Sequence, residues 1–269
     1  MRLFEFGDLH WVPEWYHVHM RRYLVFYYRL FGYFKLWIPA IAEFMNNTDS
    51  RSYLECCAGS GEVLGLVVTK LPKNLVRDKD FILTDISPMP EFVKQINAGE
   101  DSRIRYYESP VDATRIPRPL NYPRIFINSF HHFGPASATR IIRSGIEDGQ
   151  GIIILEYVRH SILGYASMLA GSLMILLTLP FVVKPRQLPL MALLTYLLPL
   201  FPLMFLWDGI VSCLRVYRPK DLATIVSEEN IPARISSFNK RSLLYPAGVS
   251  AITILPKPAQ SLTGFQESA

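Results

Sequence analysis

Short apolar runs alternate with amphipathic segments through the middle of the chain. The runs have the length of buried strands and lie at residues 53–57, 81–84, 104–108, 124–128 and 151–157. Apolar residues at helical spacing fill the intervals, at residues 62–71, 90–97 and 136–145. Strands that alternate with helices indicate right-handed βαβ units and a mostly parallel sheet. Ligands of such sheets bind at the carboxyl ends of the strands.

The N-terminal region, residues 1–50, has a helical pattern instead. Between residues 13 and 34, Arg22 and Arg29 lie opposite an aromatic face, whose members are Tyr16, Met20, Tyr23, Leu24, Tyr27, Phe31 and Phe34. A second helix is expected at residues 36–46. The first helix either docks on the core, lies at a membrane interface, or covers a substrate.

Two uncharged apolar runs interrupt the α/β pattern, at residues 162–183 and 188–207. Each is long enough to span a bilayer as a helix, but both contain prolines, and charged residues flank them. Three arrangements are open: two spans, a hairpin in one leaflet, or a helical pair buried in the domain or in an oligomer. A helix near 219–229 and strands near 233–238 and 249–255 then resume the pattern. The expected parts are an α/β core at 51–160, an insert at 161–207, completion of the core at 208–257, and a tail at 258–269.

Composition narrows the setting of the protein. The 269 residues suffice for one α/β domain with additions, and a hydrophobic fraction of 50% is high for a soluble domain. The net charge of +5 is mild and forms no basic stripe, so nucleic acid is not an expected partner. Three cysteines provide neither a disulfide framework nor a spaced metal site. No metal and no signal peptide are expected, and a reducing, cytoplasmic setting fits best.

Chemically useful residues follow the expected strands in order. They are Glu55 with Gly59 and Gly61, then Asp85, then Asp112, then Asn128 with His131 and His132, then Glu156. Over residues 51–160 this series resembles the class I S-adenosylmethionine-dependent methyltransferases. The resemblance rests on four motifs: Leu54-Glu55-Cys56-Cys57-Ala58-Gly59-Ser60-Gly61, Leu83-Thr84-Asp85-Ile86, Val111-Asp112-Ala113-Thr114 and Phe126-Ile127-Asn128-Ser129-Phe130-His131-His132-Phe133. The segment from Trp207 to Tyr217 is similar to a bacterial subgroup with a hydrophobic insert, for which the resemblance implies no substrate.

The resemblance implies an α/β, Rossmann-like sheet whose last strand is antiparallel, and a site for S-adenosylmethionine. Asp85 would accept the ribose hydroxyls, as the acid of dinucleotide folds does. Glu55 would complement the amino group and the sulfonium. Ile86 belongs to the implied cofactor set, with Asp112 and Ala113 at the adenine and Asn128 and Ser129 beneath the methionine. Cys57 stands where the family usually has its first glycine, and it lacks glycine's easy access to positive φ.

Two histidines are the candidate catalytic residues. His131 and His132 follow the fourth strand, and an imidazole near its ordinary pKa can remove a proton from an acceptor. The alternative is that they only line or cap the pocket. Glu156, Arg159, Asp208 and Arg215 are weaker candidates for substrate contacts, since charges beside apolar runs usually only flank them.

The leading hypothesis is methyl transfer to a lipophilic small molecule at the cytoplasmic face of a membrane. Whether oxygen, carbon or nitrogen is methylated stays open. A second hypothesis is a non-catalytic binding or scaffold protein that assembles, as a homo-oligomer or otherwise, through the apolar insert. A third is a nicotinamide-dependent oxidoreductase, whose sheet would lack the antiparallel last strand.

Overall fold

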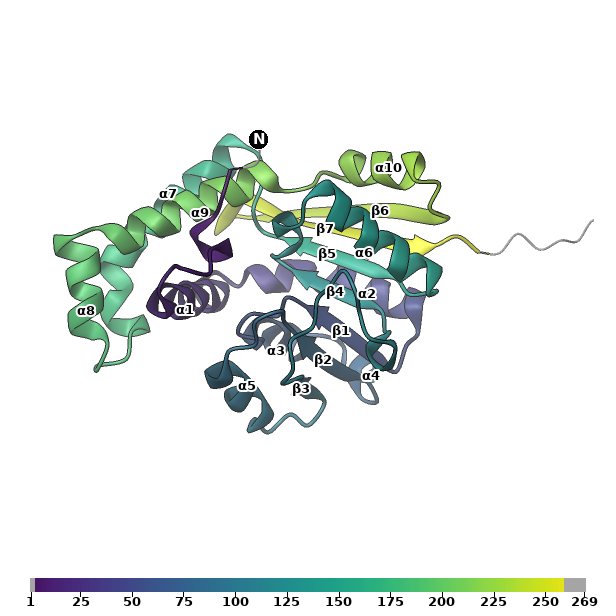
Figure 1. Ribbon diagram of the computed structural model, residues 1–269, viewed down its shortest axis with the longest axis horizontal. Helices are drawn as coiled ribbons and strands as arrows, with labels where there is room; N and C mark the ends of the chain where they lie inside the picture. Colours follow the sequence, from purple (N-terminus) through teal and green to yellow (C-terminus); the bar gives the residue numbers. More distant parts are fainter. Residues whose placement is uncertain (1–2, 259–269) are drawn as a thin grey trace, which may run out of the picture.

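The computed structural model describes residues 3–258 of the chain, so the expected tail at 258–269 lies outside the described residues except for its first position. Within that range one seven-stranded sheet has the order β3-β2-β1-β4-β5-β7-β6 (Figure 1). Its strands are β1 (Ser52–Cys56), β2 (Asp80–Thr84), β3 (Ile104–Tyr106), β4 (Arg124–Ile127), β5 (Ile152–Glu156), β6 (Ala233–Ser242) and β7 (Tyr245–Pro256).

The direction of the last strands confirms the expected sheet. β1 to β5 are mutually parallel, whereas β7 enters antiparallel beside β5 and pairs with β6 as a hairpin. An all-parallel sheet would favour the nicotinamide-dependent alternative. The observed mixed sheet is that of the class I methyltransferase fold.

Alternate residues of each strand point into two hydrophobic layers, as the period of a strand requires. Tyr53 and Phe81 face one layer, which includes helices α2 (Ile38–Thr48), α3 (Glu62–Val68), α4 (Lys73–Val76) and α5 (Pro90–Asn97). Leu54 and Phe126 face the other layer, formed by α6 (Pro135–Glu147) and α10 (Pro219–Glu228). The short α4 was not expected from the sequence pattern.

The first long helix, α1 (Glu14–Phe31), ends where Gly32 takes φ of 65°. A 3-10 segment at Tyr33–Trp37 then leads into α2. The expected single aromatic face is incomplete, since Val18, His19, Val25 and Tyr28 are also buried. The buried stripe is wider because the helix packs on the domain and also meets aromatic rings of the insert, such as Phe201.

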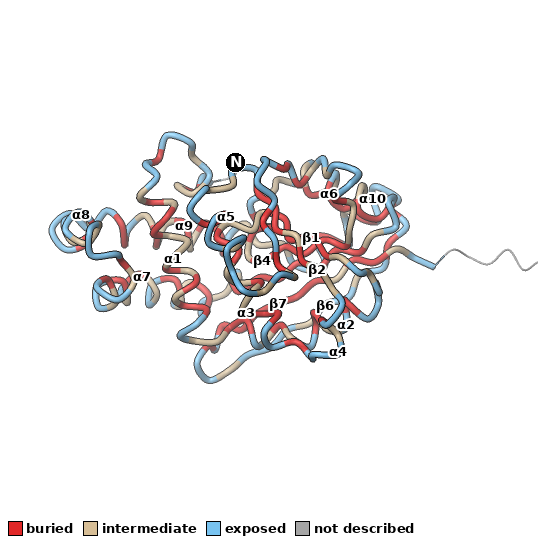
Figure 2. Tube along the Cα trace, turned by 90° about the horizontal axis from the view of Figure 1, so that it is seen from below, coloured by how far each residue is buried: buried red, intermediate tan, exposed pale blue. Residues whose placement is uncertain are grey.

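The insert forms a helical arm that extends beyond α1 (Figure 1). It consists of α7 (Ile162–Val182), α8 (Leu188–Ala192), a π-helical turn (Leu193–Leu197) and α9 (Leu200–Arg215). The second apolar run is bent by 73° between the π turn and α9, where Pro199 interrupts the helix. α9 continues past the expected boundary at residue 207 and includes Gly209 in its interior. Figure 2 shows that much of the arm near α8 is exposed.

Candidate active site

The turn from β1 into α3 forms the first part of the site. Cys57, Gly59 and Gly61 all have positive φ, at 58°, 59° and 72°. The amide of Ala58 donates to the carbonyl of Thr84 at 2.9 Å, and the amide of Gly61 donates to the carbonyl of Ala58 at 2.8 Å. Alternating left-handed positions fold the chain back on itself and leave its backbone open to a ligand.

Cys57 therefore keeps the conformation that glycine would adopt, although an L side chain there costs about 1–2 kcal/mol. Gly61 is irreplaceable for a separate reason. A Cβ on Gly61 would lie 2.2 Å from Cδ2 of Leu83, a buried residue of β2.

Asp85 lies directly beside this turn. Its Oδ2 accepts the amide of Gly59 at 2.9 Å, and its Oδ1 accepts the amide of Ser87 at 2.9 Å. A carboxylate has about four acceptor positions, so each oxygen keeps capacity for a ligand hydroxyl. The next side chain, Ile86, is 64% exposed although it is large and apolar. An exposed isoleucine beside an acid offers an apolar contact to a nucleobase.

The third motif joins the same edge through its backbone. The amide of Val111 donates to the carbonyl of Asp85 at 2.8 Å. Asp112 follows at the surface, where its Oδ1 accepts the amide of Thr114 at 2.8 Å, and Ala113 is buried. The carboxylate of Asp112 thus has its second oxygen available at the rim.

Three buried polar atoms at the ends of β1 and β4 have no hydrogen-bond partner among the described residues. They are Oε2 of Glu55, Oδ1 of Asn128 and Oγ of Ser129. Burial, and then the charge of Asp85, raises the pKa of Glu55 well above its ordinary value of 4.5. Unpaired buried polar groups cost free energy, and a ligand with amino and carboxylate groups would satisfy them. These residues therefore fit the methionine end of S-adenosylmethionine.

His131 and Glu156 form a buried pair at the ends of β4 and β5. Nδ1 of His131 lies 3.0 Å from Oε2 and 3.1 Å from Oε1 of Glu156. The backbone amide of His131 also donates to Oε1, at 3.2 Å. A carboxylate oxygen accepts from an imidazole N–H, so this contact favours the tautomer with its proton on Nδ1. Glu156, a candidate for a substrate contact from the sequence, therefore contacts His131 through both carboxylate oxygens.

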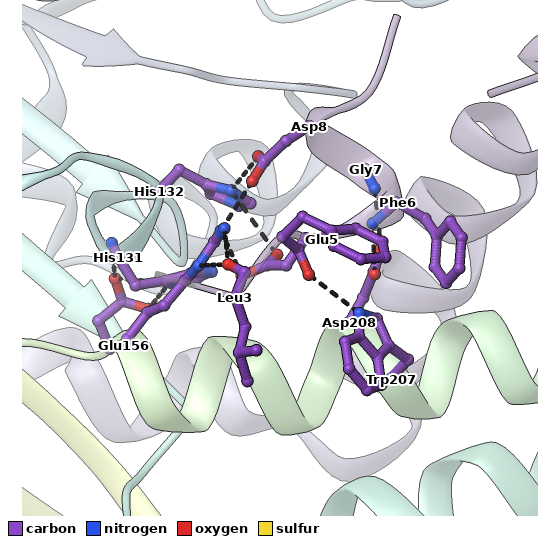
Figure 3. A network of polar contacts seen from close by, with 12 residues as sticks. Leu3, Glu5, Phe6, Gly7, Asp8, His131, His132, Glu156, Trp207 and Asp208 are labelled. Carbon is purple, nitrogen blue, oxygen red and sulfur yellow. Dashed lines mark hydrogen bonds and ion pairs between the residues drawn. The ribbon is translucent and has the colours of Figure 1, made fainter. Parts of the chain in front are cut away.

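His132 points instead toward the start of the chain (Figure 3). Its Nδ1 lies 2.7 Å from Oδ1 of Asp8 and 3.7 Å from Oε2 of Glu5. Arg215 donates to both acids, at 2.9 Å to Glu5 and 2.7 Å to Asp8. Burial opposes ionisation of Asp8, but His132 and Arg215 outweigh it and hold the pKa of that carboxyl below its usual range. For Glu5 burial dominates and raises the pKa from 4.5 to about 7.

Glu5, His131 and His132 offer ligand atoms within 4.8 Å of one another, which is close enough for a metal ion. The guanidinium of Arg215 already lies against Glu5 and Asp8. A fixed cation in this position balances the acids, and a divalent ion beside it would meet repulsion. The cluster is therefore a network of hydrogen bonds and ion pairs among the two acids, His132 and Arg215.

Residues 3–8, called here the N-terminal strap, are held on α9 (Figure 3). Asp208 accepts the amide of Phe6 at 2.6 Å and the amide of Gly7 at 2.9 Å. It also accepts the hydroxyl of Tyr16 at 2.7 Å. Asp208 and Arg215 therefore anchor the strap through largely buried side chains, unlike the solvated flanking charges that usually stand beside apolar runs. Arg159, the remaining candidate, donates to Asn239 of β6 at 2.8 Å, away from this network.

No protein-family model and no curated protein matches the chain. Solved structures match it across most of their length. The plantazolicin methyltransferase BpumL in complex with SAH aligns over 88% of this chain and 90% of its own, with a TM-score of 0.54 and 9% identity. The same enzyme with a monoazolic desmethylPZN analog and SAH aligns over 91% and 97%, with a TM-score of 0.54 and 10% identity.

At such identities the likeness concerns the fold. It agrees with the strand order and with the antiparallel β7. This chain therefore has the fold of the class I S-adenosylmethionine-dependent methyltransferases.

Proposed function

We propose that this protein transfers a methyl group from S-adenosylmethionine to a lipophilic small molecule at the cytoplasmic face of a membrane. The observation that carries the proposal is the set of unpaired buried polar atoms on Glu55, Asn128 and Ser129, beside the left-handed turn. A fold that binds no ligand at this edge would gain nothing by burying them.

The residues present fit the cofactor along its whole length. Glu55, Asn128 and Ser129 would hold the methionine end, and Asp85 would accept the ribose hydroxyls. Asp112, Ala113 and Ile86 would hold the adenine. When bound, the cofactor supplies an electrophilic methyl group on a sulfonium that is a good leaving group.

The chain's own contribution to transfer is a positioned base. Nε2 of His131 would take the proton of an acceptor hydroxyl, while Glu156 holds the ring and stabilises the imidazolium that results. The same arrangement serves an enolic or phenolic acceptor, whose oxygen or carbon becomes more nucleophilic as the proton leaves. His132, which contacts Asp8, would instead keep the strap beside this base.

The membrane setting is supported by the arm. α7 has a mean hydropathy of 1.9 over an 18-residue window, of which 28% is buried. Its exposed large side chains include Leu169, Leu173, Leu177 and Phe181. Contiguous apolar surface of this kind needs a partner, which we take to be lipid; a second copy of the chain is the competing partner. Lys184 and Arg186 follow α7, and three free thiols within residues 3–258 accord with a reducing compartment.

Calorimetry with S-adenosylmethionine tests the cofactor assignment. Asp85→Ala removes two charge-assisted hydrogen bonds to the ligand and should weaken binding about 100-fold or more. Asp78→Ala is the matched control, because Asp78 is an exposed acid in the turn before β2. No specific binding to the well-folded wild-type protein would refute the proposed activity.

Flotation with anionic liposomes tests the setting separately. We expect the full chain to float with vesicles, and Leu173→Glu with Leu177→Glu to lower the bound fraction. A protein that stays monodisperse without detergent and does not bind vesicles would refute membrane attachment. A defined dimer that dissociates in the same double variant would assign the arm to self-association instead.

A further inference from the structure

An apolar cavity of about 400 Å³ lies between α1, α7 and the turn of the β6–β7 hairpin. Tyr27, Tyr28 and Phe31 line it from the side of α1, and Met168, Gly171 and Met174 line it from α7. None of its lining residues is charged. The volume falls within the range of small-molecule sites, which are mostly apolar with a few polar groups.

One wall of the cavity is formed by the residue that follows β5. Tyr157 lines the cavity and directly follows Glu156, the partner of His131. The rings of Tyr28 and Tyr157 lie 5.6 Å apart between centroids. The hydroxyl of Tyr28 is buried and has no hydrogen-bond partner among the described residues. A polar group of a molecule bound in the cavity could satisfy this hydroxyl.

Another part of the lining joins the apolar surface of the protein. Leu163 and Leu244 both line the cavity and are 45% and 68% exposed. Leu243 and Ile162, their neighbours in the chain, are among the most exposed large apolar residues. The lining is therefore continuous from solvent-exposed leucines to the residue beside Glu156, which suits a molecule with one long apolar part.

We propose that this cavity binds the hydrocarbon chain of the methyl acceptor. The reacting end of the molecule then lies toward Glu156 and His131, and the far end of its chain lies toward Leu163 and Leu244. This assignment rests on the proposed function, since it names the part of the acceptor that confers affinity. A chain in an uncharged, aromatic cavity leaves water entirely, and each added methylene gains about fourfold in affinity until the cavity is full.

Gly171 provides a matched pair of variants. A Cβ there would lie 3.7 Å from Cε2 of Tyr27 and 4.0 Å from Cε1 of Phe205, both ordinary contact distances. Gly171→Ala therefore adds a methyl group without a clash, whereas Gly171→Leu extends a branched chain between rings that line the cavity. Both replacements favour the helix over glycine, so a difference between them reports on the cavity.

The experiment uses the full chain in amphipol, with cis-parinaric acid as the fluorescent probe and 1-alkanols of increasing length as competitors. Wild type and Gly171→Ala should bind alkanols about fourfold more tightly per methylene up to a limiting length. Gly171→Leu should weaken probe binding at least tenfold and shorten that length. Met174→Ala should lengthen it, which keeps a test available if Gly171→Leu does not fold.

S-adenosylmethionine calorimetry on the same samples separates the two proposals. The cavity assignment alone would be overturned if all variants bind the cofactor and if neither Gly171→Leu nor Met174→Ala changes probe binding. Absence of cofactor binding to the wild-type protein would overturn the proposed function. It would also overturn the identification of the bound hydrocarbon chain as part of a methyl acceptor. Cofactor binding together with the expected dependence on chain length would support both.

Discussion

Replacing Glu156 with Gln isolates the proposed role of this residue in orienting His131. The side chain keeps its shape, and its amide oxygen can still accept the backbone amide of His131 at the Oε1 position. The amide nitrogen then occupies the Oε2 position, 3.0 Å from Nδ1. A donor now faces Nδ1, and the neutral amide oxygen at the Oε1 position, 3.1 Å from Nδ1, accepts more weakly than a carboxylate does. The proton of the imidazole therefore shifts toward Nε2, where it blocks the acceptance of a second proton.

The size of the effect follows from the bond that is lost. A hydrogen bond to a charged group contributes about 1.5–3 kcal/mol, which lowers the fraction of the productive tautomer about 10- to 150-fold. We expect the methyl-transfer rate to fall by that factor. His131→Ala, which removes the base itself, should lower the rate about 10²- to 10⁴-fold.

Two measurements check this reasoning. Long-range ¹H–¹⁵N correlation spectra report which imidazole nitrogen carries the proton and need no acceptor. Transfer of radiolabelled methyl to an extract of co-purifying lipids gives the rate. Glu147→Gln, a change at an exposed carboxylate on α6, is the control. A Glu156→Gln protein with wild-type tautomer and rate, and with intact cofactor binding, would show that Glu156 does not orient a base.

Three further predictions concern the donor turn and the strap. Gly61→Ala should destabilise the protein by about 2–5 kcal/mol in chemical denaturation, because alanine is strained at positive φ and its Cβ clashes with Leu83. Gly149→Ala is the control: its φ is 74° but the space around it is open, so the cost should be only about 1 kcal/mol. Asp208→Asn should speed hydrogen exchange in the strap about 10- to 150-fold, because at least one charge-assisted bond is lost; unchanged exchange would refute the anchor. The strap should also become less stable as pH rises. Burial raises the pKa of Glu5 from 4.5 to about 7, so the contribution of neutral Glu5 to the stability of the strap is full below pH 4.5. That contribution, at most about 3 kcal/mol, is lost as pH rises through 7. Glu5→Gln should abolish that slope in exchange rates corrected for intrinsic pH dependence.

The turn after β1 and the acid after β2 could be predicted from the sequence because their determinants are local. Gly59, Gly61 and Asp85 lie at strand ends, and parallel strands bring their carboxyl ends to one edge whatever the rest of the chain does. The register of β1 with β2 pairs Cys56 with Thr84, so the turn and the acid meet without further information. The sequence shows that Cys57 stands where the family usually has glycine, but not whether the turn accommodates its side chain. Only the φ of the folded chain answers that question.

The strap depends on contacts between residues about 200 positions apart, and no periodic pattern encodes such a contact. Asp208 accepts the amide of Phe6 across 202 positions. On its own helix it is one acid at the end of an apolar run, and most such acids are solvated. It becomes an anchor only because the strap arrives with two unpaired backbone amides, which must find an acceptor once they leave water. The same reasoning applies to Glu156: one residue beyond a buried strand it could serve many roles, and the amide and ring of His131 together select one of them.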